Sequence, residues 1–174
     1  MSKKVVLGFS GGLDTTYCVK YLTEEKGYEV HSVIVNTGGF TEEELKKVEA
    51  HAYKLGVKTH TPVDAVKSYY DKIIKFLVFG NVLKNNTYPL SVSAERLSQA
   101  LHIAEHTKEL NADAVAHGST GAGNDQVRFE LTVMALDPRL KIIAPWREWS
   151  IRSREDAIAM AAKYNIPVTA TIKS

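Results

Sequence analysis

Cysteine is nearly absent from this sequence, since only Cys18 among its 174 residues carries a thiol. One thiol cannot form a disulfide within the chain, and it cannot supply a cluster of thiolate metal ligands. So few cysteines are typical of proteins from a reducing compartment. The chain is therefore not a domain held together by internal disulfides.

Long apolar runs are also lacking. The run after the basic start covers only residues 5–7 before Gly8, whereas the apolar region of a signal peptide needs about 7–15 residues. The longest apolar patch, residues 73–83, is interrupted by Lys75, Gly80 and Asn81, and a membrane span needs about 20 apolar residues. We therefore expect a cytoplasmic protein that does not use a membrane.

An excess of charge of one sign is missing as well. The chain has 22 basic and 20 acidic residues, which leaves a formal net charge of +2. Nucleic acids and anionic membranes are bound by strongly basic surfaces, so neither is expected as a partner. A pocket for a small anion remains compatible with this balance. The length and the 44% hydrophobic content are typical of one globular domain over residues 1–174.

Short apolar runs alternate with segments of helical periodicity along the chain. The runs predict strands at residues 5–9, 30–35, 57–61, 112–117 and 140–144, and residues 168–172 are either a last strand or a departing tail. The periodic segments predict helices at residues 14–26, 41–55, 64–83, 93–110, 126–136 and 153–164. This alternation predicts an α/β fold, a doubly wound and mostly parallel sheet with helices on both faces, similar to a Rossmann fold. Ligands of such sheets bind at the carboxyl ends of the strands.

Local signals refine some of these elements. Thr41 and Glu44 form a capping-box pattern, and Gly56 stands where a left-handed residue would end the same helix. In the helix at 64–83 the predicted buried stripe consists of Ala65, Tyr69, Ile73, Phe76 and Leu77. Residues 85–89 are predicted to form a loop, and Pro62 is predicted to end the third strand.

The first Gly-rich segment is Ser10-Gly11-Gly12-Leu13-Asp14-Thr15, directly after the first strand and before a helix. Glycines let the backbone approach a ligand and adopt angles that side chains forbid. The amides of such a turn and the helix N-terminus behind it bind anions, and Ser10, Thr15 and Thr16 add hydroxyl groups. Asp14 could hold Mg²⁺ between itself and bound phosphates. The alternative is a tight turn that uses glycine and polar caps for geometry alone.

The second Gly-rich segment covers residues 116–130 and contains three glycines. Thr120, Asn124 and Asp125 can bind an ammonium or a carboxylate group, and Arg128 can bind a carboxylate with two parallel hydrogen bonds. If a helix begins near Asp125, Arg128 lies one turn into it and close to the loop. Such a set of groups suits an amino acid, while the alternative is a flexible surface turn.

Three segments resemble known motifs. The first loop, SGGLDT, resembles the SGGxDS/T loop of ATP pyrophosphatases, which cleave ATP between the α- and β-phosphates; it is neither a Walker A loop nor a dinucleotide fingerprint. Residues 117–130 resemble the HGxTGKGNDQVRFE segment of argininosuccinate synthase, and residues 141–148 resemble its KxIAPWR segment. The resemblance extends over about residues 3–172, so the chain is similar to the nucleotide-binding part of that family.

The resemblance implies an adenine nucleotide α-hydrolase-like fold and an AMP-forming ligase that uses ATP and Mg²⁺. That ligase joins citrulline to aspartate through citrullyl-adenylate and releases AMP and pyrophosphate. Asp14 and Asp125 are implied as catalytic carboxylates, with Asp14 also next to the metal. The implied nucleotide-binding residues are Gly8, Phe9, Ser10, Gly11, Gly12, Leu13, Asp14, Thr15, Thr16, Val35 and Gly118. The implied substrate-binding residues are Tyr88, Ser93, Thr120, Asn124, Asp125 and Arg128.

The resemblance has departures and leaves alternatives open. Ala122 stands where many members of the family have lysine, and the family continues into a second domain that makes most of its oligomer interface. A homo-oligomer is therefore expected only where that domain is supplied. Tyr88 could instead be a packed loop aromatic, and Ser93 an ordinary helix cap. The rival functions are another adenylating enzyme with this loop, such as a tRNA-modifying one, and a non-catalytic nucleotide- or amino-acid-binding module.

Overall fold

A five-stranded parallel sheet forms the centre of the molecule, in the strand order β3-β2-β1-β6-β7. The structure is a computed structural model that describes residues 3–121, 123–149, 154–164 and 166. The strands are β1 (Lys4–Gly8), β2 (Glu29–Asn36), β3 (Thr59–Asp64), β6 (Ala114–Ala116) and β7 (Lys141–Ile143). Every pairing in this sheet is parallel, as the alternation of strands and helices predicts.

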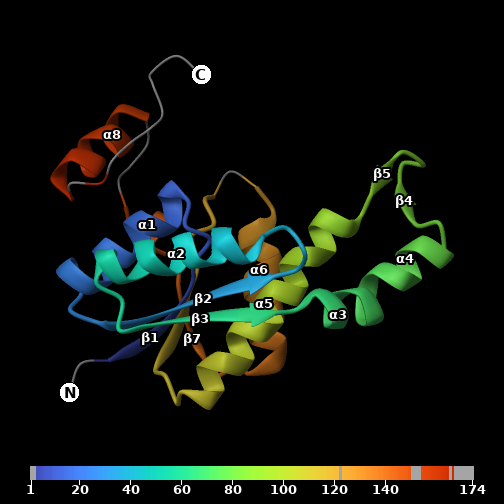
Figure 1. Ribbon diagram of the computed structural model, residues 1–174, viewed down its shortest axis with the longest axis horizontal. Helices are drawn as coiled ribbons and strands as arrows, with labels where there is room; N and C mark the ends of the chain where they lie inside the picture. The colour runs from blue at the N-terminus through green and yellow to red at the C-terminus, as the bar shows by residue number, and fades with distance from the viewer. Residues whose placement is uncertain (1–2, 122, 150–153, 165, 167–174) are drawn as a thin grey trace.

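Helices cover both faces of the sheet (Figure 1). Their bounds are α1 (Leu13–Lys20), α2 (Glu42–Leu55), α5 (Ser91–Glu109), α6 (Asp125–Leu136), α7 (Pro145–Glu148) and α8 (Arg154–Lys163). A π-helical turn, η1 (Tyr21–Glu25), continues α1 to nearly its predicted end. Helices α1 and α2 pack on one face, and α5 and α6 pack on the other. None of the helices within the described ranges is long and apolar enough to span a membrane.

The alternation of side chains along β1 divides the core into two layers. Val5 and Leu7 pack in the cluster that includes Cys18 and Leu22, whereas Val6 packs with Ile103 and Val133 on the opposite face. All of these side chains are at most 4% exposed. A strand buried on both faces is apolar at consecutive positions, which is why this run predicts a central strand so clearly.

The strand order reverses between β1 and β6. The chain runs outward from β1 through β2 to β3, and then returns to place β6 on the other side of β1. Leu7 pairs with Ala116, so the two strands end side by side and release their loops at the same edge of the sheet. This is the position at which doubly wound sheets bind their ligands.

The third strand continues past Pro62, which corrects its predicted end. Pro62 pairs in register with Ile34, and the strand extends to Asp64. Because β3 lies at the edge of the sheet, a residue without an N–H is tolerated where no further strand needs one.

The region predicted as one helix at 64–83 is an arm of several pieces. It consists of α3 (Val66–Tyr69), the π-helical η2 (Tyr70–Ile74), α4 (Lys75–Phe79) and a hairpin of β4 (Leu83–Lys84) and β5 (Tyr88–Pro89). Asn85 and Asn86 have positive φ angles of 55° and 57°, which suit asparagine in a hairpin turn. Because Tyr88 and Pro89 form β5, the segment predicted as a loop at 85–89 is partly strand.

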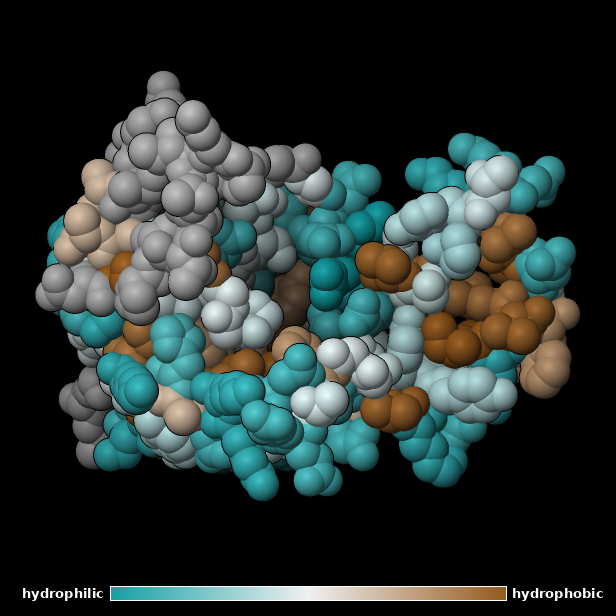
Figure 2. All heavy atoms as spheres, turned by 45° about the horizontal axis from the view of Figure 1, so that its top comes forward, coloured by the Kyte–Doolittle hydropathy of each residue, from teal (hydrophilic) through white to brown (hydrophobic). Residues whose placement is uncertain are grey.

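The arm projects from the body of the molecule (Figure 1), and this explains a wrong assignment within its predicted buried stripe. Ala65 and Tyr69, near the body, are buried, and Ile73 and Leu77 are half-buried. Phe76, by contrast, is 61% exposed, because the outer turns have no layer to pack against. Apolar side chains gather on this arm in Figure 2.

Helix α2 has the caps that the sequence predicts at both of its ends. The Thr41 hydroxyl accepts a hydrogen bond from the Glu44 N–H at 3.3 Å, the Glu44 carboxylate accepts one from the Thr41 N–H at 2.8 Å, and Gly56 follows the helix with a φ of 98°. The last predicted strand, at 168–172, and the start of the last predicted helix at Ser153 lie outside the described residues.

We predict that Thr41→Ala lowers the free energy of unfolding by about 1 kcal/mol, because a helix N–H loses its acceptor. Urea denaturation followed by circular dichroism measures the change. Thr87→Ala in the exposed hairpin turn is the matched control, and it should shift stability by less than half as much. Equal losses for the two variants would contradict the capping role.

Candidate functional site

A cavity of 570 Å³ opens at the carboxyl ends of β1 and β6. Figure 2 shows the middle of this face hollowed and bordered by hydrophilic residues. The residues that line the cavity are Gly8, Phe9, Ser10, Asp14, Thr15, Val33, Ile34, Val35, Phe40, Glu95, Arg96, Gln99, Ile103, His117, Gly118, Ser119, Thr120, Gly123, Asp125 and Phe129. Both Gly-rich segments therefore face one space, as their positions after strands predict.

The first loop presents backbone N–H groups at the start of α1. The helix is capped by Gly12, whose lack of a side chain leaves the first-turn N–H groups without a side-chain acceptor. Gly11 has a φ of 78°, and a Cβ there would lie 3.1 Å from Val48, so glycine is required at this position. Gly12 has an ordinary φ of −75°, so the prediction of unusual backbone angles is wrong for Gly12.

The two loops touch each other at Gly118. A Cβ on Gly118 would lie 2.8 Å from Thr15 Cγ2 and 3.4 Å from the Thr15 backbone nitrogen. The missing side chain therefore lets the loop after β6 pack directly on the first turn of α1. This approach places the N–H groups of α1 and the polar residues of the second loop around the same ligand space.

Asp14 contributes a carboxylate to the cavity lining. Its side chain reaches solvent, but the surrounding protein removes part of its hydration and raises the pKa of the carboxyl above its ordinary value. Ser10 and Thr15 line the same space, and their hydroxyl oxygens lie 3.4 Å apart. Across the described residues, no group of three or more His, Cys, Asp or Glu side chains is arranged to hold a metal ion.

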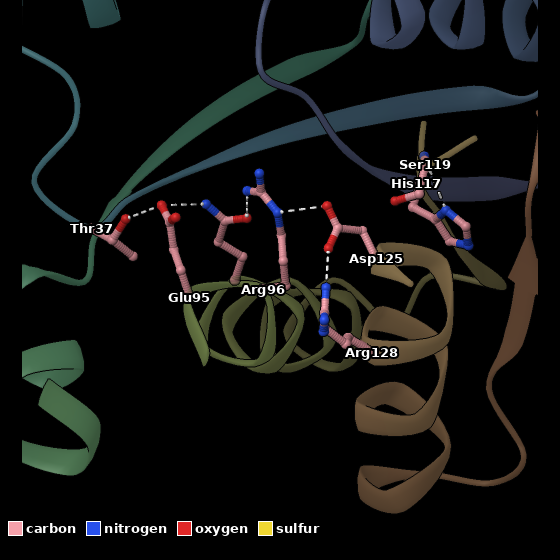
Figure 3. A network of polar contacts seen from close by, with 8 residues as sticks. Thr37, Glu95, Arg96, His117, Ser119, Asp125 and Arg128 are labelled. Atoms are coloured by element: carbon pink, nitrogen blue, oxygen red, sulfur yellow. Dashed lines mark hydrogen bonds and ion pairs between the residues drawn. The ribbon is translucent and has the colours of Figure 1, made fainter. Parts of the chain in front are cut away.

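Asp125 begins α6 and is held by two arginines (Figure 3). Its Oδ1 accepts a hydrogen bond from Arg128 Nη1 at 2.7 Å, and its Oδ2 accepts one from Arg96 Nε at 3.3 Å. Arg128 lies one turn into the helix, as predicted. Its guanidinium is directed to Asp125 and does not line the cavity.

The polar contacts continue along α5 to the connection after β2 (Figure 3). Arg96 Nη1 donates to Gln99 Oε1 at 2.8 Å, and Gln99 Nε2 donates to Glu95 Oε1 at 3.1 Å. The same Glu95 oxygen accepts a hydrogen bond from the Thr37 hydroxyl at 2.6 Å. Glu95, Arg96 and Gln99 were missed by the sequence prediction. Their spacing of three and four residues on a helix after Ser93 is the signal that could have indicated a shared polar face.

His117 lies buried behind the second loop as a neutral side chain. Its Nδ1 accepts a hydrogen bond from the Ser119 N–H at 3.3 Å, so the proton is on Nε2, which lies 3.0 Å from Glu130 Oε1. Arg147 pairs with the same Glu130 oxygen. Burial, together with the positive charge of Arg147, lowers the pKa of His117 from 6.5 to about 4.

The structure brings only part of the predicted site together. The predicted residues that line the cavity are Gly8, Phe9, Ser10, Asp14, Thr15, Val35, Gly118, Thr120 and Asp125. Gly11, Gly12, Leu13, Asn124 and Arg128 are next to it in the chain but do not line it.

Thr16, Tyr88 and Ser93 do not line this cavity, and their contacts to ligand stay predictions. The Thr16 hydroxyl is buried 3.0 Å from His51 Nε2, between α1 and α2. Tyr88 stands on the projecting arm and is 49% exposed. Ser93 is inside α5, whose N-cap is Leu90, so the alternative that Ser93 caps the helix is wrong.

We predict that Gly118→Ala weakens nucleotide binding about tenfold or more, because the added methyl group forces the two loops apart. Gly121→Ala is the matched control, since a Cβ at Gly121 meets no atom within 4 Å. Isothermal titration calorimetry with ATP measures both variants. An unchanged dissociation constant for Gly118→Ala would show that the contact with Thr15 does not shape the binding site.

We predict that the free energy of unfolding falls as the pH drops from about 6.5 towards 4, because the unfolded chain binds a proton on His117 and the folded chain does not. The difference between the two pKa values corresponds to at most roughly 3 kcal/mol. His117→Gln keeps a donor and an acceptor without titrating, so it should flatten this dependence. Urea denaturation at about pH 7 and about pH 5 measures it. Parallel pH curves for the two proteins would contradict the prediction.

Comparison of the sequence with known proteins shows to which family the chain is related. Residues 4–167 match the family model described as the arginosuccinate synthase N-terminal HUP domain. The argininosuccinate synthase of Pyrobaculum aerophilum is 44% identical over 167 residues, which is 96% of this chain and 41% of that protein. Those of Carboxydothermus hydrogenoformans and Roseiflexus castenholzii are 45% and 46% identical, over 99% and 98% of this chain and 43% and 42% of theirs. The chain thus spans about two fifths of the length of these relatives. It belongs to the arginosuccinate synthase N-terminal HUP domain family.

Proposed function

We propose that this chain is the ATP-binding part of an argininosuccinate synthase, a ligase that joins citrulline to aspartate and releases AMP and pyrophosphate. The observation that carries the proposal is the packing of Gly118 on Thr15, which puts a phosphate-type loop and an amino-acid-type loop around one cavity. A reaction between a nucleotide and an amino acid requires such shared space, because the reacting atoms must approach within van der Waals contact.

The first loop would bind the phosphates of ATP. Gly12 caps α1 without a side-chain hydrogen bond to the N–H groups of the first turn, and the helix dipole favours negative charge at this end. Ser10 adds a hydroxyl donor within the cavity, whereas the Thr15 hydroxyl donates to the Gly12 carbonyl oxygen at 3.1 Å. The same fixed donors would stabilise the charge that develops on the α-phosphate when the citrulline ureido oxygen forms its bond to phosphorus and the bond to pyrophosphate breaks.

Asp14 fits a magnesium ion that is held jointly with the nucleotide. Mg²⁺ in nucleotide sites is bound by one or two carboxylates plus phosphate oxygens, and a single carboxylate beside the phosphate loop meets this minimum. When bound, the ion would neutralise phosphate charge. The Asp14 carboxylate would orient the magnesium ion. It is the acidic side chain that the described residues place in the first turn of α1.

Thr120 and Asp125 would bind the amino-acid substrates, with Asn124 and Arg128 immediately beside them. Asp125 is positioned by both Arg96 and Arg128, so a substrate would meet a carboxylate whose direction is already set. Contacts of Tyr88 and Ser93 with citrulline remain sequence predictions. The cytoplasmic location and a homo-oligomer are likewise proposals that rest on the sequence and on the family.

A tRNA-thiolating activity is a weaker proposal. Such an enzyme would need a reactive thiolate, whereas Cys18 is fully buried and its burial raises the pKa of the thiol above the ordinary range. The other alternative, a non-catalytic binding module, would bind the same ligands as the synthase but would not turn them over. Because the chain spans about two fifths of its relatives, binding and turnover have to be tested separately.

We predict that calorimetry detects ATP binding to the chain, and that Asp14→Ala and Gly12→Val abolish it. A Cβ at Gly12 would meet only Ser10 Oγ, at 3.4 Å, so we expect the valine variant to fold and its methyl groups to obstruct the phosphate loop. Asp71→Ala, on the arm, is the matched control for the lost carboxylate. Wild-type affinity in both site variants would refute the phosphate-loop assignment.

We predict pyrophosphate release that depends on both citrulline and aspartate when the remaining part of a relative is supplied in trans or by fusion. A coupled pyrophosphate assay measures the rate, with each amino acid omitted in turn as a control. ATP binding without release in the completed protein would favour the binding module instead.

A further inference from the structure

The segment at residues 141–148, the third one that resembles the family, has no role in the cavity described so far. All of its residues are described, and none of them lines the cavity. The segment includes β7 and α7, and it lies beside the loop after β6 because β7 pairs with β6 in parallel register. Its side chains can therefore affect a ligand only through other residues that do line the cavity.

The main chain of this segment is fixed to the sheet and to α1. The loop after β6 starts at His117, whose N–H donates to the Ile143 carbonyl oxygen at 3.2 Å. Helix α7 begins two residues later, at Pro145. The Trp146 ring packs edge-on against the Tyr17 ring of α1, with 6.3 Å between the ring centres. The next residue, Arg147, therefore extends from a backbone that is held on both sides.

Arg147 determines the direction of the Glu130 carboxylate. Arg147 Nη2 pairs with Glu130 Oε1, and the same oxygen lies 3.0 Å from His117 Nε2. The Arg147 side chain is 52% exposed, whereas that of Glu130 is 20% exposed. An ion pair with so exposed a partner contributes little to the stability of a fold. The main effect of this pair is therefore to aim the carboxylate at His117.

His117 connects this carboxylate to the main chain of the loop. Its ring is 2% exposed and lies 5.0 Å from the Phe129 ring. With the proton on Nε2, its Nδ1 accepts a hydrogen bond from the Ser119 N–H at 3.3 Å (Figure 3). The other tautomer would place an N–H at Nδ1 against the Ser119 N–H, and it would leave the Glu130 carboxylate facing a lone pair. Glu130 therefore selects the tautomer that orients the Ser119 N–H.

The orientation of this N–H matters because the peptide group before Ser119 follows Gly118, the contact between the two Gly-rich loops. Gly118 lies so close to α1 that a Cβ on it would be 2.8 Å from Thr15 Cγ2. If the Ser119 N–H turned away from His117, the peptide group would rotate and Gly118 would leave this position. The contacts outside the cavity therefore reach its lining.

We propose that Arg147 and Glu130 are positioning residues for the loop after β6. Arg147 holds the Glu130 carboxylate, and Glu130 fixes the tautomer of His117. His117 in turn orients the Ser119 N–H. Neither Arg147 nor Glu130 lines the cavity, so neither contacts a ligand in it. The inference rests on the proposed function only for its effect on nucleotide binding, because the geometry of the loop can be measured without a ligand.

Nitrogen-15 NMR of the imidazole rings measures the tautomer, and His117→Gln assigns the signal. At about pH 7 the wild type should show an unprotonated Nδ1 and a protonated Nε2. Glu130→Ala should give a mixture of tautomers, and its Ser119 amide should exchange with solvent about tenfold faster or more. Arg147→Ala should change both quantities less and in the same direction. Arg147→Lys should restore most of the wild-type values, since it keeps a charged donor beside Glu130.

Two variants that break ion pairs elsewhere are the matched controls. Arg139→Ala removes the cation beside Asp137, and Glu105→Ala removes the carboxylate beside His102. Neither pair contacts the loop after β6, so both variants should keep the wild-type tautomer and Ser119 exchange rate. Thermal unfolding followed by circular dichroism shows whether each variant is folded at the temperature of the NMR experiment.

Calorimetric titration with a non-hydrolysable ATP analogue measures the effect on the cavity. Glu130→Ala should weaken binding about fivefold or more, because the loop that packs on α1 is no longer held in place. The double variant Glu130→Ala with Arg147→Ala should lose no more affinity than Glu130→Ala alone, since the two residues act through one series of contacts. Additive losses would show that Arg147 acts by another route, and they would overturn its assigned role.

The measurements separate this inference from the proposed function. An unchanged His117 tautomer and an unchanged Ser119 exchange rate in Glu130→Ala overturn the inference, whatever that variant does to stability. A changed tautomer with wild-type affinity for the ATP analogue overturns the link from His117 to the binding site. Failure of the wild type to bind the ATP analogue overturns the proposed function, while the NMR and exchange data still decide whether Glu130 and Arg147 position the loop.

Discussion

Close packing between Gly118 and the first turn of α1 is the constraint on which the site depends. A single methyl group would not fit between them, since a Cβ at Gly118 would lie 2.8 Å from the Thr15 side chain. The contact exists because β1 and β6 are neighbours in parallel register, with Leu7 opposite Ala116. Two loops separated by about a hundred residues in the chain thereby form one cavity wall.

Charges in the cavity are separated into two environments. At the start of α1 the donors are backbone N–H groups, which favour an anion. Along α5 and α6, donors and acceptors alternate from Thr37 to Arg128, and this pattern matches a ligand that carries both charges. Behind the second loop, His117 stays neutral, because its Nδ1 accepts a hydrogen bond that a protonated ring could not accept.

The projecting arm shows how tertiary context changes both packing and function. Its sequence has helical periodicity, yet the outer turns lie beyond the layers of the sheet, and Phe79 is 82% exposed. The same projection carries Tyr88 away from the cavity. Burial therefore stabilises only the base of the arm, where Ala65 and Tyr69 pack against the body.

The sequence by itself determined the parallel α/β fold, the limits of α2 and the two Gly-rich loops, because these depend on local periodicity, caps and glycine. It also predicted that Asp14, Thr120 and Asp125 share one site, because both Gly-rich segments come after strands, and all three line the cavity. Only the tertiary structure decided that Thr16 turns towards His51 and that Pro62 continues an edge strand. It alone brought Glu95, Arg96 and Gln99 to the cavity, because the face that a helix presents depends on what packs against it.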